Sequence, residues 1–132
     1  MFSLKVEGGF SSAHNLRGYK GKCEDLHGHN WRVEITVKSG ELDNIGMVLD
    51  FKYLKSRLNA VLEELDHKYL NKLAFFSATK RGGSAKNSGG KKINPSSENI
   101  AKYIYHKLKT RVPLLDCVTV WENSTSAATY GE

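Results

Sequence analysis

Hydrophobic and polar residues alternate in two stretches within the first forty positions of the chain. Every second residue is apolar in both stretches: Phe2, Leu4 and Val6 in the first, and Trp31, Val33, Ile35 and Val37 in the second. Successive side chains of a β-strand point to opposite faces of a sheet, so each stretch would have one apolar face. The pattern predicts two half-buried antiparallel strands.

After the short apolar run 47–49, the spacing of apolar residues becomes that of a helix. Six of them fall on one side of a 3.6-residue repeat: Phe51, Leu54, Leu58, Val61, Leu62 and Leu65. Asp50 precedes them directly and is a candidate N-cap, because its side chain can accept a hydrogen bond from the first turn. We expect this helix to end near Asp66-His67.

A second helix is predicted after the polar segment 94–99, where a serine and the acid Glu98 form a typical helix start. The next apolar residues are spaced by four: Ile100, Ile104 and Leu108. Segments 117–122 and 127–130 then have strand character on either side of a turn at 123–126, which predicts a hairpin. The order is strand, strand, helix, helix, strand, strand, an α+β fold in a single domain spanning 1–132.

The net charge of +6 is concentrated in one segment. Five positive charges and no acid lie within 79–92: Lys80, Arg81, Lys86, Lys91 and Lys92. Subtracting these five from +6 leaves +1 for the rest of the chain. The segment is rich in Gly, Ser, Lys and Asn and cannot bury enough apolar surface to pack, which predicts a solvated, flexible loop. Contact of this loop with phosphate or RNA is the alternative interpretation.

Length and composition are those of a cytoplasmic protein with one core. No apolar run approaches the length of a membrane span, and the first residues lack the charged and apolar regions of a signal peptide. The chain has two cysteines, which are too few for a disulfide framework. Their settings suggest that Cys23 is a reactive thiol and that Cys117 is a strand-core residue.

Three histidines near the N-terminus form a candidate metal site. His27 and His29 are one residue apart, so an extended backbone would direct both imidazoles to the same face, and His14 would be the third ligand. Three histidines with an open fourth position are typical of catalytic zinc. The alternative is a set of surface histidines that make ordinary hydrogen bonds. Cys23 lies four residues before His27, near Lys20 and Lys22, where positive charge favours the thiolate; alone, it would more often be a small buried hydrophobe.

Three further groups are candidates for binding or proton transfer. Asp66 could orient the imidazole of His67, although exposed polar pairs are common at helix ends. Glu122 ends a strand, and its two oxygens match the adjacent N–H groups of an amino-pyrimidinone ring; a solvated edge carboxylate is the alternative. Ser97 and Glu98 are candidates for substrate contact, although a first-turn acid ordinarily belongs to the helix start.

Taken together, six blocks resemble the family of 6-pyruvoyl- and 6-carboxy-tetrahydropterin synthases. In chain order these blocks are 10–14, 23–30, 47–51, 65–71, 95–104 and Trp121-Glu122. The resemblance runs from about Phe2 to Tyr130, and the order of the blocks makes it specific. Some family members have a short connection at the place of the basic segment near 76–93. Relative to them, this segment resembles an insertion.

The resemblance implies a tunnel fold, in which a four-stranded antiparallel sheet carries two helices on one face. Sheets from several subunits join into a barrel, usually in a hexamer of two trimers, and the active site lies between subunits. The implied roles are zinc binding by His14, His27 and His29, general base catalysis by Cys23, proton handling by Asp66 and His67, and pterin anchoring by Glu122.

The spacing before the His-Gly-His motif separates branches of the family. Three residues lie between Cys23 and His27, which is similar to the 6-carboxy-tetrahydropterin synthases of queuosine and deazapurine biosynthesis; the pyruvoyl enzymes have a longer spacing. The carboxy enzymes convert 7,8-dihydroneopterin triphosphate to 6-carboxytetrahydropterin, acetaldehyde and triphosphate. Glu24 instead resembles a variant that cleaves dihydroneopterin derivatives for folate synthesis, so dual activity is an open alternative.

Two other classes of function are weighed against this enzyme. A zinc-containing RNA-binding module would explain the histidines and the basic loop, but it leaves Cys23, Asp66-His67 and Glu122 without a role, and aromatic residues do not interleave with the lysines. A catalytically silent scaffold of the same fold is the other alternative.

Overall fold

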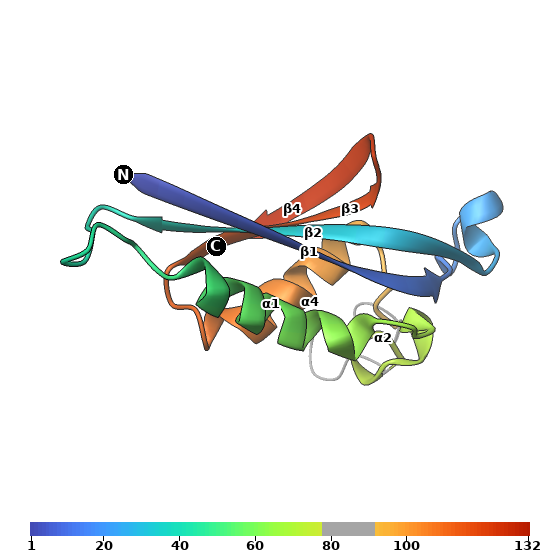
Figure 1. Ribbon diagram of the computed structural model, residues 1–132. Coiled ribbons are helices and arrows are strands. Elements are labelled where there is room, and N and C mark those ends of the chain that lie inside the picture. The colour runs from blue at the N-terminus through green and yellow to red at the C-terminus, as the bar shows by residue number, and fades with distance from the viewer. Residues whose placement is uncertain (78–91) are drawn as a thin grey trace, which may run out of the picture.

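The computed structural model describes residues 1–77 and 92–132 of the chain. A four-stranded antiparallel sheet in the order β1-β2-β3-β4 is covered on one face by two long helices (Figure 1). The strands are β1 (Phe2–His14), β2 (His27–Ser39), β3 (Leu115–Asn123) and β4 (Ser126–Gly131), and the long helices are α1 (Phe51–Leu65) and α4 (Ser97–Lys109). Short helical turns are η1 (Lys22–Glu24), η2 (Leu70–Lys72) and α2 (Ala74–Ser77). The basic segment expected near 76–93 lies, apart from its two ends, outside the described residues.

The predicted α+β order is confirmed, but the first two strands are longer than the apolar alternation indicated. Their ladder runs from the pair Phe2 and Ser39 to the pair His14 and His27. Apart from the buried Phe10, the added residues carry small or polar side chains, which an apolar pattern does not detect, although their backbone groups pair like the others. The extra length brings the three histidines into the sheet.

Both long helices begin where the sequence predicts, because each N-cap side chain satisfies a backbone N–H of the first turn. The Asp50 carboxylate accepts a hydrogen bond from Lys52 N at 2.7 Å. The Ser96 hydroxyl accepts one from Asn99 N at 3.2 Å.

Two residues expected in the core lie outside it. Phe51, the first residue of α1, is 52% exposed and lines an open surface cavity with Met47. Cys117 is only partly buried, because side chains alternate along β3 and the adjacent Val118 takes the core face. The prediction that Cys117 is a strand-core residue is therefore wrong.

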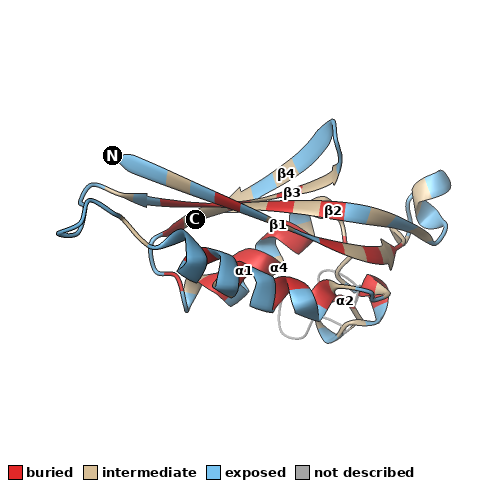
Figure 2. Ribbon diagram, in the orientation of Figure 1, coloured by how far each residue is buried: buried red, intermediate tan, exposed pale blue. Residues whose placement is uncertain are grey.

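The core fills the space between the sheet and the two long helices, and buried residues concentrate on the facing sides of both layers (Figure 2). Its largest fully buried side chains come from β2, α4 and α2: Trp31, Tyr105 and Phe76. Within 1–77 and 92–132, none of the helices is both long enough and apolar enough to cross a bilayer.

Gly8 allows α1 to pack closely against β1. A Cβ atom at this position would lie 2.8 Å from Leu62 Cδ1 and 3.1 Å from Asn59 Oδ1. These distances are shorter than van der Waals contact, so a larger residue would push the helix away from the sheet.

We expect Gly8→Ala to lower the free energy of unfolding by about 1–3 kcal/mol, because the added methyl group overpacks the strand–helix contact. Gly40→Ala is the matched control, since no atom lies within 4 Å of a Cβ built at Gly40. Urea denaturation of both variants measures the difference. Equal stability of the two variants would contradict this account of the packing.

Candidate metal centre

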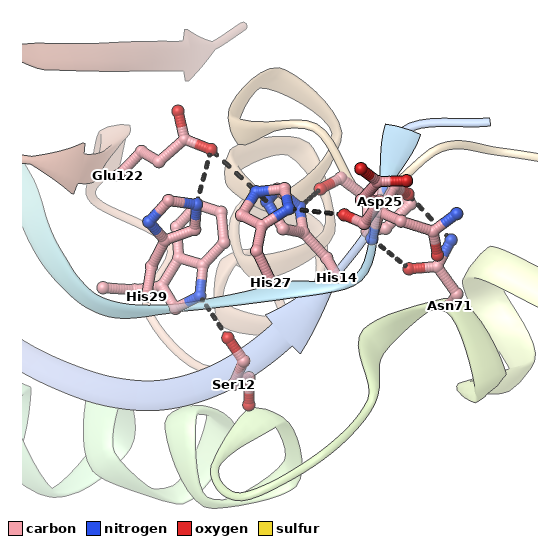
Figure 3. Close-up of polar contacts among 10 residues, drawn as sticks. Ser12, His14, Asp25, His27, His29, Asn71 and Glu122 are labelled. Atoms are coloured by element: carbon pink, nitrogen blue, oxygen red, sulfur yellow. Dashed lines mark hydrogen bonds and ion pairs between the residues drawn. The ribbon is translucent and has the colours of Figure 1, made fainter. Parts of the chain in front are cut away.

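Three strands direct polar side chains to one end of the helix-covered face of the sheet. His14 follows the buried Phe10 on the same face of β1, and His27 and His29 share a face of β2 with the buried Trp31. Antiparallel pairing places His14 opposite His27. Glu122 joins them from the end of β3, so the group combines residues far apart in sequence (Figure 3).

The donor atoms of this group are spaced like the ligands of one ion. His14 Nε2 lies 3.0 Å from His27 Nε2, and Glu122 Oε1 lies 3.3 Å from His14 Nε2 and 3.1 Å from His29 Nε2. Zinc ligands about 2.0–2.2 Å from a tetrahedral ion are about 3.3–3.5 Å from one another. All four donor atoms lie within 4.8 Å of one another, so small adjustments would complete such a shell.

Backbone carbonyls determine which nitrogen of two imidazoles faces the centre. His14 Nδ1 lies 2.7 Å from Pro95 O, and His27 Nδ1 lies 2.7 Å from Asp25 O. A carbonyl only accepts hydrogen bonds, so each neutral ring carries its proton on Nδ1 and a lone pair on Nε2. The two lone pairs then face each other at 3.0 Å, an arrangement that a shared cation stabilises.

The surroundings of His29 also indicate that these residues can bind a metal. Its Nε2 atom is buried and has no hydrogen-bond partner among the described residues, because the nearby Glu122 oxygen does not have hydrogen-bond geometry. A buried polar atom of this kind is costly unless it binds something. Imidazole nitrogens and a carboxylate oxygen are ligands typical of zinc.

The electrostatic environment keeps two of the imidazoles neutral, which is the form that binds metal. Burial lowers the pKa of His14 below 6.5, and the neighbouring histidines lower it further, against raising effects of the Pro95 carbonyl and Glu122. Burial likewise lowers the pKa of His29, against a raising effect of Glu122.

Asp66 and His67 form a separate pair at the outer edge of β1. Asp66 Oδ1 accepts a hydrogen bond from Ser11 N at 2.8 Å, and Asp66 Oδ2 lies 2.9 Å from His67 Nδ1. His67 N donates to Ser11 O at 2.7 Å, and the residue has a φ of +54°. The Ser11 N–H and then His67 lower the pKa of Asp66. The imidazole is 83% exposed, so this pair faces outward and is not part of the four-residue group.

The other candidates do not belong to the four-residue group. Cys23 is partly buried and Glu24 is exposed, both in η1, and neither belongs to the four-residue group. Ser97 is partly buried and Glu98 is exposed in the first turn of α4. This turn directly follows Pro95, whose carbonyl holds His14.

Sequence reasoning missed a set of amide side chains that fixes the loop after His14. The buried Asn71 accepts from Asn15 N at 3.0 Å and donates to Asn15 O at 2.9 Å. Asn94 makes the same two-way contact with the backbone of Arg17, at 3.0 Å each way. No local pattern marks these contacts, because each joins segments more than fifty residues apart.

A family model described as 6-pyruvoyl tetrahydropterin synthase matches residues 3–132. The chain belongs to this family. The resemblance inferred from the six sequence blocks is thereby confirmed, and so is the four-stranded antiparallel sheet with two helices on one face.

Two bacterial relatives and one solved structure illustrate the match. The 6-carboxy-5,6,7,8-tetrahydropterin synthase of Synechocystis sp. is 38% identical, over 98% of this chain and 93% of its own length. The Haemophilus influenzae protein of the same name is 33% identical over 100% of both chains. The structure of Caenorhabditis elegans 6-pyruvoyl tetrahydropterin synthase is 30% identical, with a TM-score of 0.80 over 99% of this chain and 95% of that chain.

We expect His27→Ala or His29→Ala to lose bound zinc, because two imidazoles are a poor substitute for three. Both variants should fold, since the core lies on the other side of Trp31. Metal analysis of the purified proteins gives the zinc content, and circular dichroism gives the fold. Full zinc occupancy in either variant would remove that residue from the ligand set.

The metal-free protein should lose stability as the pH falls below 6.5, the ordinary histidine pKa. The reason is that the folded-state pKa values of His14 and His29 are lowered, so the unfolded chain binds more protons in this range. Denaturant titrations in chelator between about pH 8 and 5 measure the slope. His14→Gln should flatten it and the exposed His106→Gln should not; equal slopes in these two variants would contradict the assignment.

Proposed function

We propose that this chain is a zinc-dependent 6-carboxy-5,6,7,8-tetrahydropterin synthase. It would convert 7,8-dihydroneopterin triphosphate and one water molecule to 6-carboxytetrahydropterin, acetaldehyde and triphosphate. The observation that carries the proposal is the pair of Nε2 lone pairs 3.0 Å apart, each fixed by a carbonyl on the opposite side of its ring. The product is the one named for the two bacterial relatives, and the spacing between Cys23 and His27 is similar to that branch.

In this proposal His14, His27 and His29 hold zinc at the end of the sheet. Zinc supplies a Lewis acid that binds the vicinal hydroxyls of the substrate side chain and stabilises negative charge as protons move. The buried Trp31 closes the inner side of the site, with its ring centroid 4.9 Å from that of His14 and 5.1 Å from that of His29.

Cys23 is proposed as the general base that removes a proton from the substrate side chain. Its turn, η1, connects the two strands that carry the histidines. Cys23 O accepts a hydrogen bond from Leu16 N at 2.8 Å, which fixes this turn beside the end of β1. The contact supports a defined position for the thiol near the metal centre.

Asp66 and His67 are proposed as the proton-handling pair. With Nδ1 of His67 directed at Asp66 Oδ2 at 2.9 Å, the other ring nitrogen is available to exchange a proton with the substrate. The exposed position of the pair on the edge of β1 favours action on a neighbouring subunit. We therefore propose that sheets of several copies join into a barrel, as a hexamer of two trimers, with active sites between subunits.

Two observations define second candidates for the product. The Caenorhabditis elegans structure is named for the pyruvoyl reaction. Glu24 lies beside Cys23 in η1 with its side chain exposed, and a carboxylate there would suit cleavage to a 6-hydroxymethyl pterin. We propose that the main activity belongs to a cytoplasmic queuosine-type pathway. Ser97 and Glu98 are proposed as further substrate contacts.

Incubation of the zinc-loaded protein with 7,8-dihydroneopterin triphosphate, followed by mass analysis, tests the function. We expect 6-carboxytetrahydropterin and acetaldehyde. Cys23→Ala should reduce this product about 10²–10⁴-fold, the usual cost of losing a proton-transfer group, while zinc content stays unchanged. Cys117→Ala is the matched control and should retain activity. A pyruvoyl product from the wild type, or near-normal carboxy product from Cys23→Ala, would contradict the proposal.

A further inference from the structure

Glu122 is placed to bind a metal and is also the proposed anchor of the pterin ring. A single orientation of its carboxylate cannot do both. Its Oε1 atom lies among the imidazoles, 3.1 Å from His29 Nε2 and 3.3 Å from His14 Nε2. Figure 3 shows its other oxygen directed away from the histidine rings. Among the residues that the structure describes, this second oxygen has no hydrogen-bond or ion-pair partner.

In the observed orientation, Oε1 would be the fourth protein ligand of a metal ion held by the three histidines. Its distances to two imidazole nitrogens are close to the about 3.3–3.5 Å expected between ligands of one zinc ion. A zinc ion with four protein ligands is of the closed, structural type, whereas a catalytic ion keeps a position for water or substrate. With all four residues bound, the metal centre would be of the closed type, and substrate could reach the ion only after one ligand leaves.

Recognition of a pterin ring requires a different orientation of the same side chain. Adjacent N–H groups of an amino-pyrimidinone bind a carboxylate through both oxygens, side by side. In the observed conformation, the space in front of Oε1 is taken by the nitrogens of His14 and His29. The carboxylate must leave the imidazoles before it can present both oxygens to a ring.

The local structure permits this movement. The pairing of β3 with β4 shifts register between Trp121 and Asn123, so Glu122 stands at a β-bulge, a feature that redirects side chains near functional sites. The side chain is 28% exposed, and the turn that follows β3 is exposed. Rotation about its side-chain bonds would break the contacts of Oε1 with His14 and His29 and no other polar contact of this side chain among the described residues.

We propose that Glu122 is an exchangeable metal ligand: it closes the metal centre in the absence of substrate and moves to the pterin ring when substrate binds. Pterin recognition and opening of the fourth coordination position are then one event. The proposal rests on the pterin function proposed above. The Glu122 carboxylate would thus cover the metal when substrate is absent and leave the metal when substrate binds.

The first test measures zinc affinity without any substrate, by competition with a chromophoric chelator. Glu122→Gln and Glu122→Ala should bind zinc at least about tenfold more weakly than the wild type. Glu7→Gln is the matched control, because Glu7 lies in β1 on the opposite face, 2.9 Å from Arg32. Unchanged affinity in both Glu122 variants, with the fold verified by circular dichroism, would overturn the proposal.

The second test replaces zinc with cobalt(II), whose visible absorption reports coordination, and adds neopterin, an oxidised pterin that does not react. The wild-type spectrum should change on neopterin binding, as the carboxylate leaves the metal. The spectrum of Glu122→Ala should differ from that of the wild type before neopterin is added, and neopterin should bind to this variant more weakly. A wild-type spectrum that stays constant while calorimetry shows neopterin bound would overturn the exchange.

These outcomes are separate from those of the product assay. Weak zinc binding and a neopterin-sensitive spectrum in a protein that forms no carboxy product would refute the proposed reaction but retain the exchangeable ligand. Normal carboxy product together with a zinc affinity independent of Glu122 would refute the exchangeable ligand but retain the proposed reaction. A wild type that binds neither neopterin nor 7,8-dihydroneopterin triphosphate would overturn both.

Discussion

The register of β1 against β2 is the constraint on which the metal centre depends. His14 pairs with His27, and Ser12 pairs with His29, so the three imidazoles meet on one face only in this alignment. A slip of one residue would turn His27 and His29 to the opposite face. The core opposes such a slip, because Phe10 and Trp31 stack next to the histidines with ring centroids 5.7 Å apart.

Backbone carbonyls then orient two of the three imidazoles for metal binding. Pro95 belongs to the segment that leads into α4, and Asp25 belongs to the loop between β1 and β2. The amide contacts of Asn71 and Asn94 hold this loop and this segment to each other and to the end of β1. The tautomers of His14 and His27 are thus determined by the packing of helix, loop and sheet, which is how outer contacts tune a metal site.

One strand carries two functional groups that point in different directions. The face of β1 presents His14 to the metal centre, whereas its edge holds Asp66 and His67 through the backbone of Ser11. A face and an edge of the same strand cannot converge within one chain, which is the physical argument for an active site shared between copies. The backbone of this edge strand, which would otherwise be open to unspecific pairing, positions the Asp66 and His67 pair for which proton handling is proposed.

The sequence by itself determined the elements whose signals are local. Alternation, helical spacing and the N-caps Asp50 and Ser96 predicted the order of strands and helices, and the spacing of His27 and His29 predicted a shared face. Tertiary structure decided what depends on contacts between distant segments. The pairing of β2 with β3 and the bulge at Glu122 bring this carboxylate to the histidines, whereas a strand-end acid alone suggested only a ring anchor. The burial of Cys117 was also decided by tertiary structure. Alternation shows that the two faces of a strand differ, but only packing shows which face is buried.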